Sequence, residues 1–166
     1  MSELKDIIYS LVAGLADSKE VSMPRLIKAM YLYDWSAILN SHVKDSRLNW
    51  TYSMCGPACP MVEKCVADNP LLFNRYRKDN HVGGQKEMVR IVQDDYVPAL
   101  SDESIRAVSH VIHVIRGLSW QELSHLIYST MPMVMASVGG PLDLERAAQV
   151  RWAALNRVAK EGKRKQ

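Results

Sequence analysis

Apolar residues recur at helical spacing along most of this chain. Between Glu3 and Ala16, leucine, isoleucine and valine fall three and four residues apart, which predicts an amphipathic helix. A second helix is expected to begin at Ser22-Met23-Pro24 and to run to about Leu39. The serine hydroxyl can accept from free backbone amides, and proline is tolerated in a first helical turn. The start of the chain is therefore predicted to be helical.

One carboxylate interrupts the apolar face of this second helix. The face consists of Ile27, Met30, Tyr31 and Ile38, and Asp34 lies in its centre. A buried ionised acid needs donors or partners, because removing it from water is costly. Two interpretations follow: Asp34 clamps a neighbouring loop through backbone amides, or it contacts a binding partner.

The middle of the chain contains signals for short strands. Residues Asn49 to Met54 alternate, with Trp50 and Tyr52 on one face, and Cys55-Gly56-Pro57 predicts a rigid turn. A short helix is expected from Pro60 to Val66. Beyond it, two segments rich in aromatic and branched residues flank a polar stretch with glycines and predict a small hairpin, namely Leu71 to Tyr76 and Met88 to Val92.

Helical patterns return in the second half of the chain. Ser101 opens a helix that ends at Gly117, and Ser119 with Glu122 forms a capping box for the next helix, which Pro132 limits. The first of these helices should bury Ile105, Val108, Ile112 and Ile115, and the second Leu123, Leu126 and Ile127. The last helix begins near Asp143 and aligns Leu144, Ala148, Trp152 and Leu155 for docking on the body.

These elements predict a mainly α fold with a small β element, in the α+β class. The expected arrangement is a single compact helical domain with a short hairpin over residues 1–160, whose final docking helix spans about 143–160, followed by a basic flexible tail at 161–166. The chain has 166 residues, of which 48% are hydrophobic and 23% charged, as in one ordinary globular domain. No apolar run approaches the ~20 residues that cross a bilayer, and MSELKDII lacks the layout of a secretion signal. We expect a cytoplasmic protein without a membrane span.

Charge is distributed unevenly along the chain. Residues 1–145 carry 14 basic and 17 acidic side chains, a net charge of −3, whereas residues 146–166 carry seven basic residues and one acidic residue, a net charge of +6. A basic end can bind nucleic acid by displacing counterions. Lysine and arginine are also favourable at the end of a helix. No recognition-helix or RNA-binding motif accompanies the cluster.

No arrangement of catalytic or metal-ligating residues stands out. Cys55, Cys59 and Cys65 are odd in number and lack the spacing of a zinc knuckle, so they are interpreted as reduced thiols. His110 and His113 lie three residues apart without a matching acid or cysteine. We expect no enzyme activity, no cofactor and no metal, with a metal or enzyme site built from these cysteines and a histidine as the remaining alternative.

Several segments together resemble a known family. Lys28-Ala29-Met30-Tyr31-Leu32-Tyr33-Asp34, the stretch from Trp50 to Gly56-Pro57, Leu100-Ser101, Leu118 to Ser124 and Met131-Pro132 are similar in order and spacing to the signature of the Panacea domain, also called SocA-like or GepA-like. The resemblance covers about residues 5–136. Departures are Tyr33 in place of alanine, Met54-Cys55 in place of an aromatic residue, and Tyr128 where a histidine is common. A function that depends on that histidine has no basis in this chain.

The resemblance implies a mostly helical domain with a small strand element, found in phage-associated proteins and in toxin–antitoxin operons. It further implies an antitoxin that neutralises a co-encoded protein toxin by direct contact. The matching positions are Tyr31, Asp34, Trp50, Gly56 and Pro57, and Tyr52 from the same aromatic face completes the expected partner-binding set. The alternative is a nucleic-acid-binding or regulatory prophage-associated protein that uses the basic C-terminal end.

Overall fold

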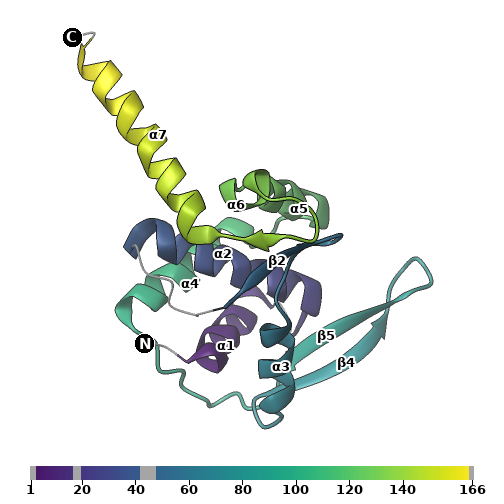
Figure 1. Cartoon of the computed structure of the whole chain (residues 1–166). Coiled ribbons are helices and arrows are strands. Elements are labelled where there is room, and N and C mark those ends of the chain that lie inside the picture. The colour runs from purple at the N-terminus through teal and green to yellow at the C-terminus, as the bar shows by residue number, and fades with distance from the viewer. Residues whose placement is uncertain (1–2, 17–19, 42–47, 165–166) are drawn as a thin grey trace.

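The chain folds into helices packed around one central helix, with two small sheets beside them (Figure 1). The computed structural model describes residues 3–16, 20–41 and 48–164. Within these residues there are seven helices and six strands, which places the fold in the α+β class as predicted. In chain order they are α1 (Leu4–Leu15), β1 (Glu20–Ser22), α2 (Met23–Ser41), β2 (Trp50–Ser53), β3 (Gly56–Ala58), α3 (Pro60–Asp68), β4 (Phe73–Asp79), β5 (Gln85–Ile91), α4 (Asp102–Ile115), α5 (Trp120–Tyr128), α6 (Met131–Met135), β6 (Pro141–Leu142) and α7 (Leu144–Arg164).

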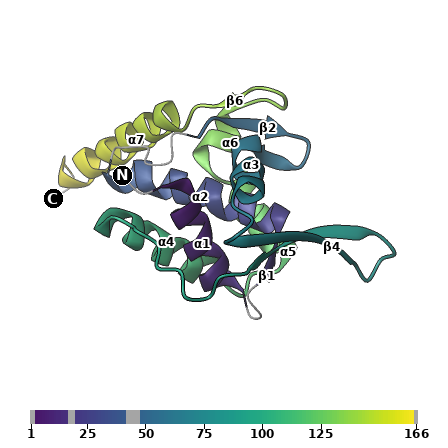
Figure 2. The same cartoon turned by 90° about the horizontal axis from the view of Figure 1, so that it is seen from below.

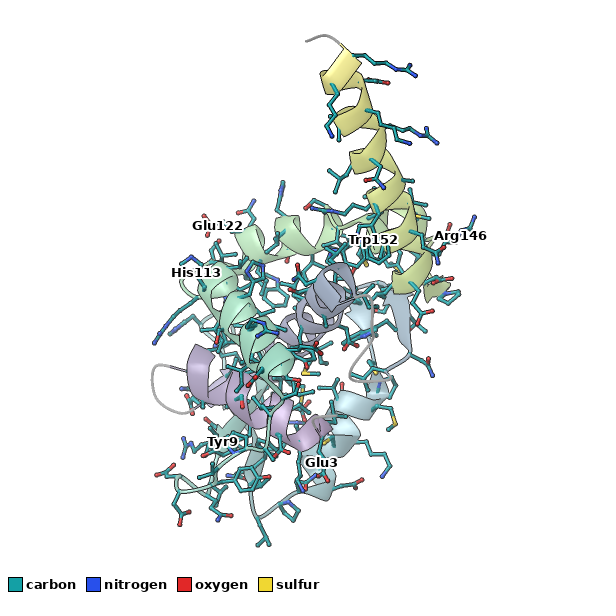
Figure 3. The ribbon with its side chains drawn as sticks, turned by 90° about the vertical axis from the view of Figure 1, so that its left-hand side faces the viewer. Glu3, Tyr9, His113, Glu122, Arg146 and Trp152 are labelled. Atoms are coloured by element: carbon teal, nitrogen blue, oxygen red, sulfur yellow. The ribbon has the colours of Figure 1, made fainter. Side chains whose placement is uncertain are left out.

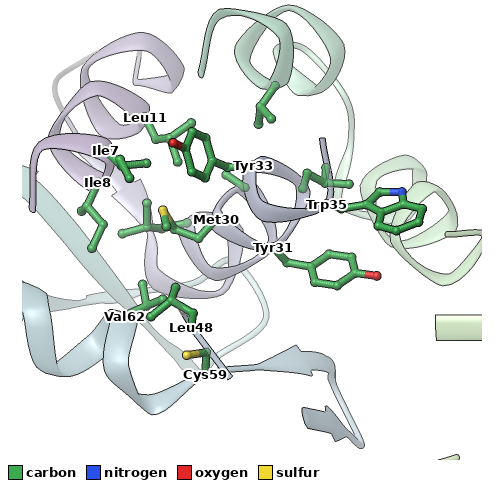
Figure 4. Close-up of a cluster of buried hydrophobic side chains, with 14 of the residues drawn as sticks. Ile7, Ile8, Leu11, Met30, Tyr31, Tyr33, Trp35, Leu48, Cys59 and Val62 are labelled. Atoms are coloured by element: carbon green, nitrogen blue, oxygen red, sulfur yellow. The ribbon is translucent and has the colours of Figure 1, made fainter. Parts of the chain in front are cut away.

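The helix α2 forms the centre of the molecule. It contacts α1, α3, α4 and α7 as well as strands from both sheets, so every residue from 28 to 38 is buried. In the close-up of the core, Tyr33 points toward Leu11 of α1 while Tyr31 extends on another side of α2 (Figure 4). A helix enclosed on all sides has no solvent face. Its polar side chains therefore need partners inside the protein.

Each sheet has three antiparallel strands. One has the order β1-β5-β4, with Val21 opposite Val89 and Phe73 opposite Ile91. The other has the order β3-β2-β6, with Trp50 opposite Leu142. Strands β4 and β5 form the predicted hairpin, which extends away from the helices (Figure 2). Both sheets join segments that are distant in sequence.

Most of the predicted helices are confirmed, together with their caps. Ile7, Ile8, Leu11 and Val12 of α1 are fully buried. The Ser101 side chain accepts from the Ser104 amide and begins α4. Ser119 and Glu122 form the expected capping box of α5, with the Ser119 amide donating to Glu122 at 2.7 Å.

Three local predictions are wrong. The tight turn consists of Met54-Cys55, because Gly56 and Pro57 pair with β2 as strand β3. Pro57 is tolerated there since β3 is an edge strand. Ile105 is 48% exposed, and α4 buries the neighbouring stripe of Ala107, Val108, Val111 and Ile115. Helix α5 already ends at Tyr128, and Pro132 lies in the first turn of α6.

The last helix, α7, leaves the body of the protein (Figure 1). Leu144 and Ala148 are buried and Trp152 packs against the core, as predicted. Leu155 is 58% exposed, so its predicted docking is wrong. The body ends before the fourth turn, and the helix continues to Arg164, past the expected boundary at residue 160. Lys165 and Gln166 of the expected tail lie outside the described residues.

None of the helices in the described ranges is long and apolar enough to cross a membrane.

Candidate functional site

Three of the segments that carry the family resemblance meet around Lys28. This side chain comes from α2 and donates to the Cys55 carbonyl oxygen, at 3.0 Å, in the turn between β2 and β3. The Lys28 ammonium also lies over the ring of Trp120, 4.5 Å from the ring centre, at the start of α5. We call the set Lys28, Tyr52, Cys55, Gly56, Trp120 and Tyr128 the Lys28 corner. One buried cation thus joins three segments that are far apart in sequence.

Lys28 is held in an apolar setting without a carboxylate. Its residue is only 3% exposed, and no acidic side chain in the described part of the chain forms an ion pair with it. Removal from water lowers the pKa of Lys28, an effect that the nearby Cys55 side chain partly offsets. The carbonyl oxygen and the indole face are therefore the groups that stabilise the ammonium.

Gly56 gives the turn its shape. Its φ of +102° lies in the region that favours glycine. A Cβ built at this position would stand 3.6 Å from the Tyr128 hydroxyl and 3.7 Å from Lys28 Nζ, so there is room for a methyl group. Ser53 fixes the turn from inside, because its hydroxyl donates to the Gly56 carbonyl at 2.8 Å and accepts from the Cys55 amide at 3.2 Å. The backbone conformation, and not a lack of room for a side chain, explains why position 56 is a glycine.

Asp34 and Trp50 form a second connection between α2 and β2. The indole nitrogen of Trp50 donates to Asp34 Oδ2 at 2.7 Å. Tyr31 meets the Trp50 ring edge to face at 5.5 Å and shares a 2.7 Å hydrogen bond with the Thr130 hydroxyl. Asp34, Trp50 and Tyr31 are each at most 2% exposed. Asp34 thus holds β2 against α2, and burial raises the pKa of Tyr31, which keeps its hydroxyl protonated.

The structure brings the six predicted partner-binding residues into one region but hides most of them. Tyr31, Asp34, Trp50, Gly56 and Pro57 are buried, and Tyr52 is half-buried with its ring 6.1 Å from that of Tyr128. Buried residues shape a surface without forming it. Their role in binding a partner remains a prediction, and any such role would be indirect in this conformation.

The exposed surface of the region belongs to residues that the sequence analysis did not select. Met54 is 84% exposed, Trp120 48% and Tyr128 38%. Partial removal from water raises the pKa of Tyr128, so the phenol is neutral at physiological pH. Trp120 carried no signal that separates it from the core, because it lies three and seven residues before Leu123 and Ile127, on the face of the predicted apolar stripe. Lys28 carried none either, because nothing in the local pattern marks it as buried.

A pocket of about 320 Å³ adjoins the Lys28 corner, between the start of α2, the β2–β3 turn and α3. Besides Lys28 and Cys55 it is lined by Glu63 and Glu87, and both carboxylates pair with Arg75. The two acids are thus engaged with the same guanidinium, which holds the pKa of Glu87 below its ordinary value. The pocket combines one buried cation with two acids that share a single guanidinium.

The three cysteines do not form a metal site. Cys55 is exposed, Cys59 is buried, and Cys65 is half-buried on α3. No group of three or more potential ligands that could hold a metal ion occurs among residues 3–16, 20–41 and 48–164. Burial raises the pKa of Cys65 to about 11, so this thiol is protonated at neutral pH and is a poor nucleophile.

Comparisons with protein-family models, with curated proteins and with solved structures find no match to this chain. The resemblance to the Panacea domain therefore stays a prediction from the quoted sequence segments.

Proposed function

We propose that this chain is an antitoxin that neutralises a protein toxin by direct contact at the Lys28 corner. The observation that carries the proposal is the convergence of three resembling segments on this corner. Lys28 comes from the first segment, Cys55 and Gly56 from the second, and Trp120 from the fourth. Segments that are far apart in the sequence can serve one function when they form one site.

The surface at this corner has the chemistry of a protein interface. Tryptophan, tyrosine and methionine are enriched at the centres of such interfaces, where they bury large areas at low entropic cost. Trp120, Tyr128 and Met54 are all partly or largely exposed. The buried contacts of Lys28 and Trp50 hold the underlying turn and strand in place, which favours binding without rearrangement.

The test is co-expression with the product of the neighbouring gene. We expect that product to stop growth when expressed alone, and this chain to restore growth and to co-purify with it. Trp120→Ala and Tyr128→Ala should each weaken the complex by about tenfold or more, since central aromatic residues dominate interfaces. Leu71→Ala is the matched control, because Leu71 is 80% exposed and lies outside the corner.

A neighbouring product that is harmless alone and never co-purifies would overturn the proposal. If a complex forms and both aromatic variants bind as tightly as Leu71→Ala, the interface lies elsewhere. Thermal unfolding of each variant separates loss of binding from loss of fold.

The outer half of α7 favours a second candidate function, nucleic-acid binding. Arg157, Lys160 and Arg164 are exposed and follow one another at intervals of three and four residues along one face. Their replacement by glutamine should reduce the affinity for DNA or RNA. It should also lower the slope of log affinity against log salt concentration by the amount expected for about three phosphate contacts. Unchanged affinity and salt dependence in this triple variant would dismiss the candidate.

A further inference from the structure

A groove of about 490 Å³ lies on the other flank of α5, between α2, α4 and α7. Leu126 of α5 and Ser129, which directly follows this helix, line the groove, whereas Trp120 and Tyr128 belong to the Lys28 corner. Figure 3 looks onto this side of the molecule, with α4 and α7 on either side of α2 and Trp152 between α7 and the body. The groove is therefore a surface separate from the one assigned above.

The groove is lined partly by apolar and partly by polar side chains, the polar ones being Ser36, Asn40, His110, Ser129, Thr130 and Arg151. Trp35 and Leu39 line it from α2, Val114 from α4 and Leu126 from α5. Leu39, Val114 and Leu126 are half-buried and pack against the core with one side only. Because an apolar cavity of about 150 Å³ can accommodate benzene, this groove has room for about three side chains of that size. Such a row of side chains is what one face of a helix presents.

Helix α7 extends the apolar surface beyond the body. The face that buries Leu144 and Ala148 continues about two and three turns after Ala148 with Leu155 and Val158, which are 58% and 68% exposed. Arg151 lies on the same side and lines the groove. The apolar face of α7 is thus occupied by the body in its first half and bare in its second half.

The positive charge at the groove favours an acidic partner. Arg151 is an exposed cation, no aspartate or glutamate lines the groove in the described part of the chain, and no described acid forms an ion pair with Arg151. The outer half of α7 carries four basic residues against Glu161 alone, so α7 of a second copy would bring like charge to Arg151. A concave groove also fits a helix better than a flat lipid surface.

We propose that this groove docks an amphipathic helix of another protein, one that inserts apolar side chains against Leu39, Val114 and Leu126 and places a carboxylate on Arg151. Leu155 and Val158 of α7 would cover the exposed end of the docked helix. The inference stands apart from the antitoxin proposal, because the two concern different surfaces.

The test uses the full chain and three synthetic helical peptides of sixteen residues. The first has leucines spaced three and four residues apart with flanking glutamates, the second has lysines in place of the glutamates, and the third has alanines in place of the leucines. We expect the leucine–glutamate peptide to bind, and each of the other two to bind about tenfold or more weakly. Fluorescence anisotropy with labelled peptides measures the affinities.

Charge reversal on α7 locates the binding site. Arg151→Glu should weaken binding of the leucine–glutamate peptide by about fivefold or more, as expected when an attractive pair becomes repulsive. Arg157→Glu is the matched control: it makes the same change on α7 outside the face that Arg151 shares with Leu155 and Val158, and it should leave the affinity unchanged. Leu155→Ser tests whether the bare turn of α7 takes part and should also weaken binding.

Three outcomes would overturn the inference: no binding of the leucine–glutamate peptide, equal binding of the glutamate and lysine peptides, or equal loss in Arg151→Glu and Arg157→Glu. A fourth contrary outcome comes from sedimentation of the chain alone. If the chain forms a dimer that Leu155→Ser dissociates, a second copy of the chain occupies the groove. Whether Arg151→Glu still restores growth on co-expression tests the antitoxin proposal separately. Either proposal can therefore fail without the other.

Discussion

At the scale of single residues, two buried charged groups on the same helix explain how the corner is held together. Lys28 and Asp34 lie six positions apart on α2, and each reaches a different part of the β2–β3 hairpin. One holds the turn by its Cys55 carbonyl, and the other holds the strand by its Trp50 indole. A buried charge is costly unless it is bonded, so each contact is worth more than a surface hydrogen bond.

The first residue-scale prediction concerns the titration of Lys28. Its pKa is lowered by burial, whereas the pKa of Lys64, which pairs with Asp68 on the surface, is raised. Carbon NMR of the lysine side chains should therefore show Lys28 losing its proton at lower pH than Lys64. Because the folded state holds this proton less tightly than the unfolded state, the Lys28 contribution to stability should rise with pH between the two pKa values.

Lys28→Met supplies the control, since it removes this titration and should flatten that part of the stability profile. A Lys28 signal that titrates together with Lys64 would contradict the buried setting of the ammonium.

The second residue-scale prediction is that Trp50→Phe destabilises the protein by about 2 kcal/mol or more. The substitution preserves most of the ring but removes the donor to a fully buried carboxylate. Trp120→Phe makes the same chemical change at a half-exposed position and should cost less than about 1 kcal/mol. Urea unfolding of both variants measures the difference, and equal losses would show that the Asp34 contact contributes little.

At the scale of secondary-structure elements, short polar sequences determine where the helices begin. The Ser119 hydroxyl accepts from the Glu122 amide at 3.2 Å, and Glu122 accepts in return from the Ser119 amide. These bonds lower the pKa of Glu122. They also fix the start of α5, whose first residue is Trp120 of the Lys28 corner.

We therefore predict that Ser119→Ala costs about 1 kcal/mol of stability, the usual value for a lost N-cap. Ser109→Ala, on the exposed side of α4, should be neutral or slightly stabilising because alanine is the better helix former. Thermal unfolding of the two variants checks the contrast. A loss in Ser109→Ala as large as that in Ser119→Ala would argue against the capping box as the cause.

Elements whose signals are local could be predicted from the sequence. Helices α1 and α5 and the β4–β5 hairpin carry their periodicity, caps and glycines within their own residues. Strands β1 and β6 were missed because each is two or three residues long and depends on a partner far along the chain, such as Val21 on Val89. Strand β3 was missed because Gly56 and Pro57 are residues typical of turns, although an edge strand accommodates the proline.

The candidate site was predicted in outline only. Asp34 was identified because an acid interrupts an apolar stripe, which is a local signal. Lys28 and Tyr128 could not be identified in this way, since their proximity to Gly56 arises from packing among three distant segments. The sequence of α2 gave no further signal for the position of Lys28, because the helix is buried on all sides and has no clear polar face.

At the scale of the whole molecule, the acidic body and the basic end correspond to two structural parts. The net charge of −3 belongs to residues 1–145, and the net charge of +6 belongs almost entirely to α7. Only Leu144, Ala147 and Ala148 of that helix are buried, and Trp152 is the last to pack on the core. The outer half of α7 adds charge and apolar surface but little to the core.

We predict that removal of residues 154–166 leaves the unfolding temperature within about 3 °C of that of the full chain, since the described residues of this segment, 154–164, are all exposed. Removal of residues 144–166 should lower it much more, because Leu144 and Ala148 leave a gap in the core. Calorimetry distinguishes the two truncations. A large loss in the shorter truncation would show that the outer half of α7 stabilises the fold.

The pairing of Trp50 with Leu142 also has a consequence for synthesis on the ribosome. Strand β2 is made early, but its partner residue in β6 is 92 positions away. It emerges only after six of the seven described helices, α1 to α6, have been translated. Contacts between such distant segments form slowly because the intervening chain must first be ordered. The pairing of β2 with β6 should therefore be among the last contacts of a nascent chain to acquire protection from hydrogen exchange, together with the docking of α7.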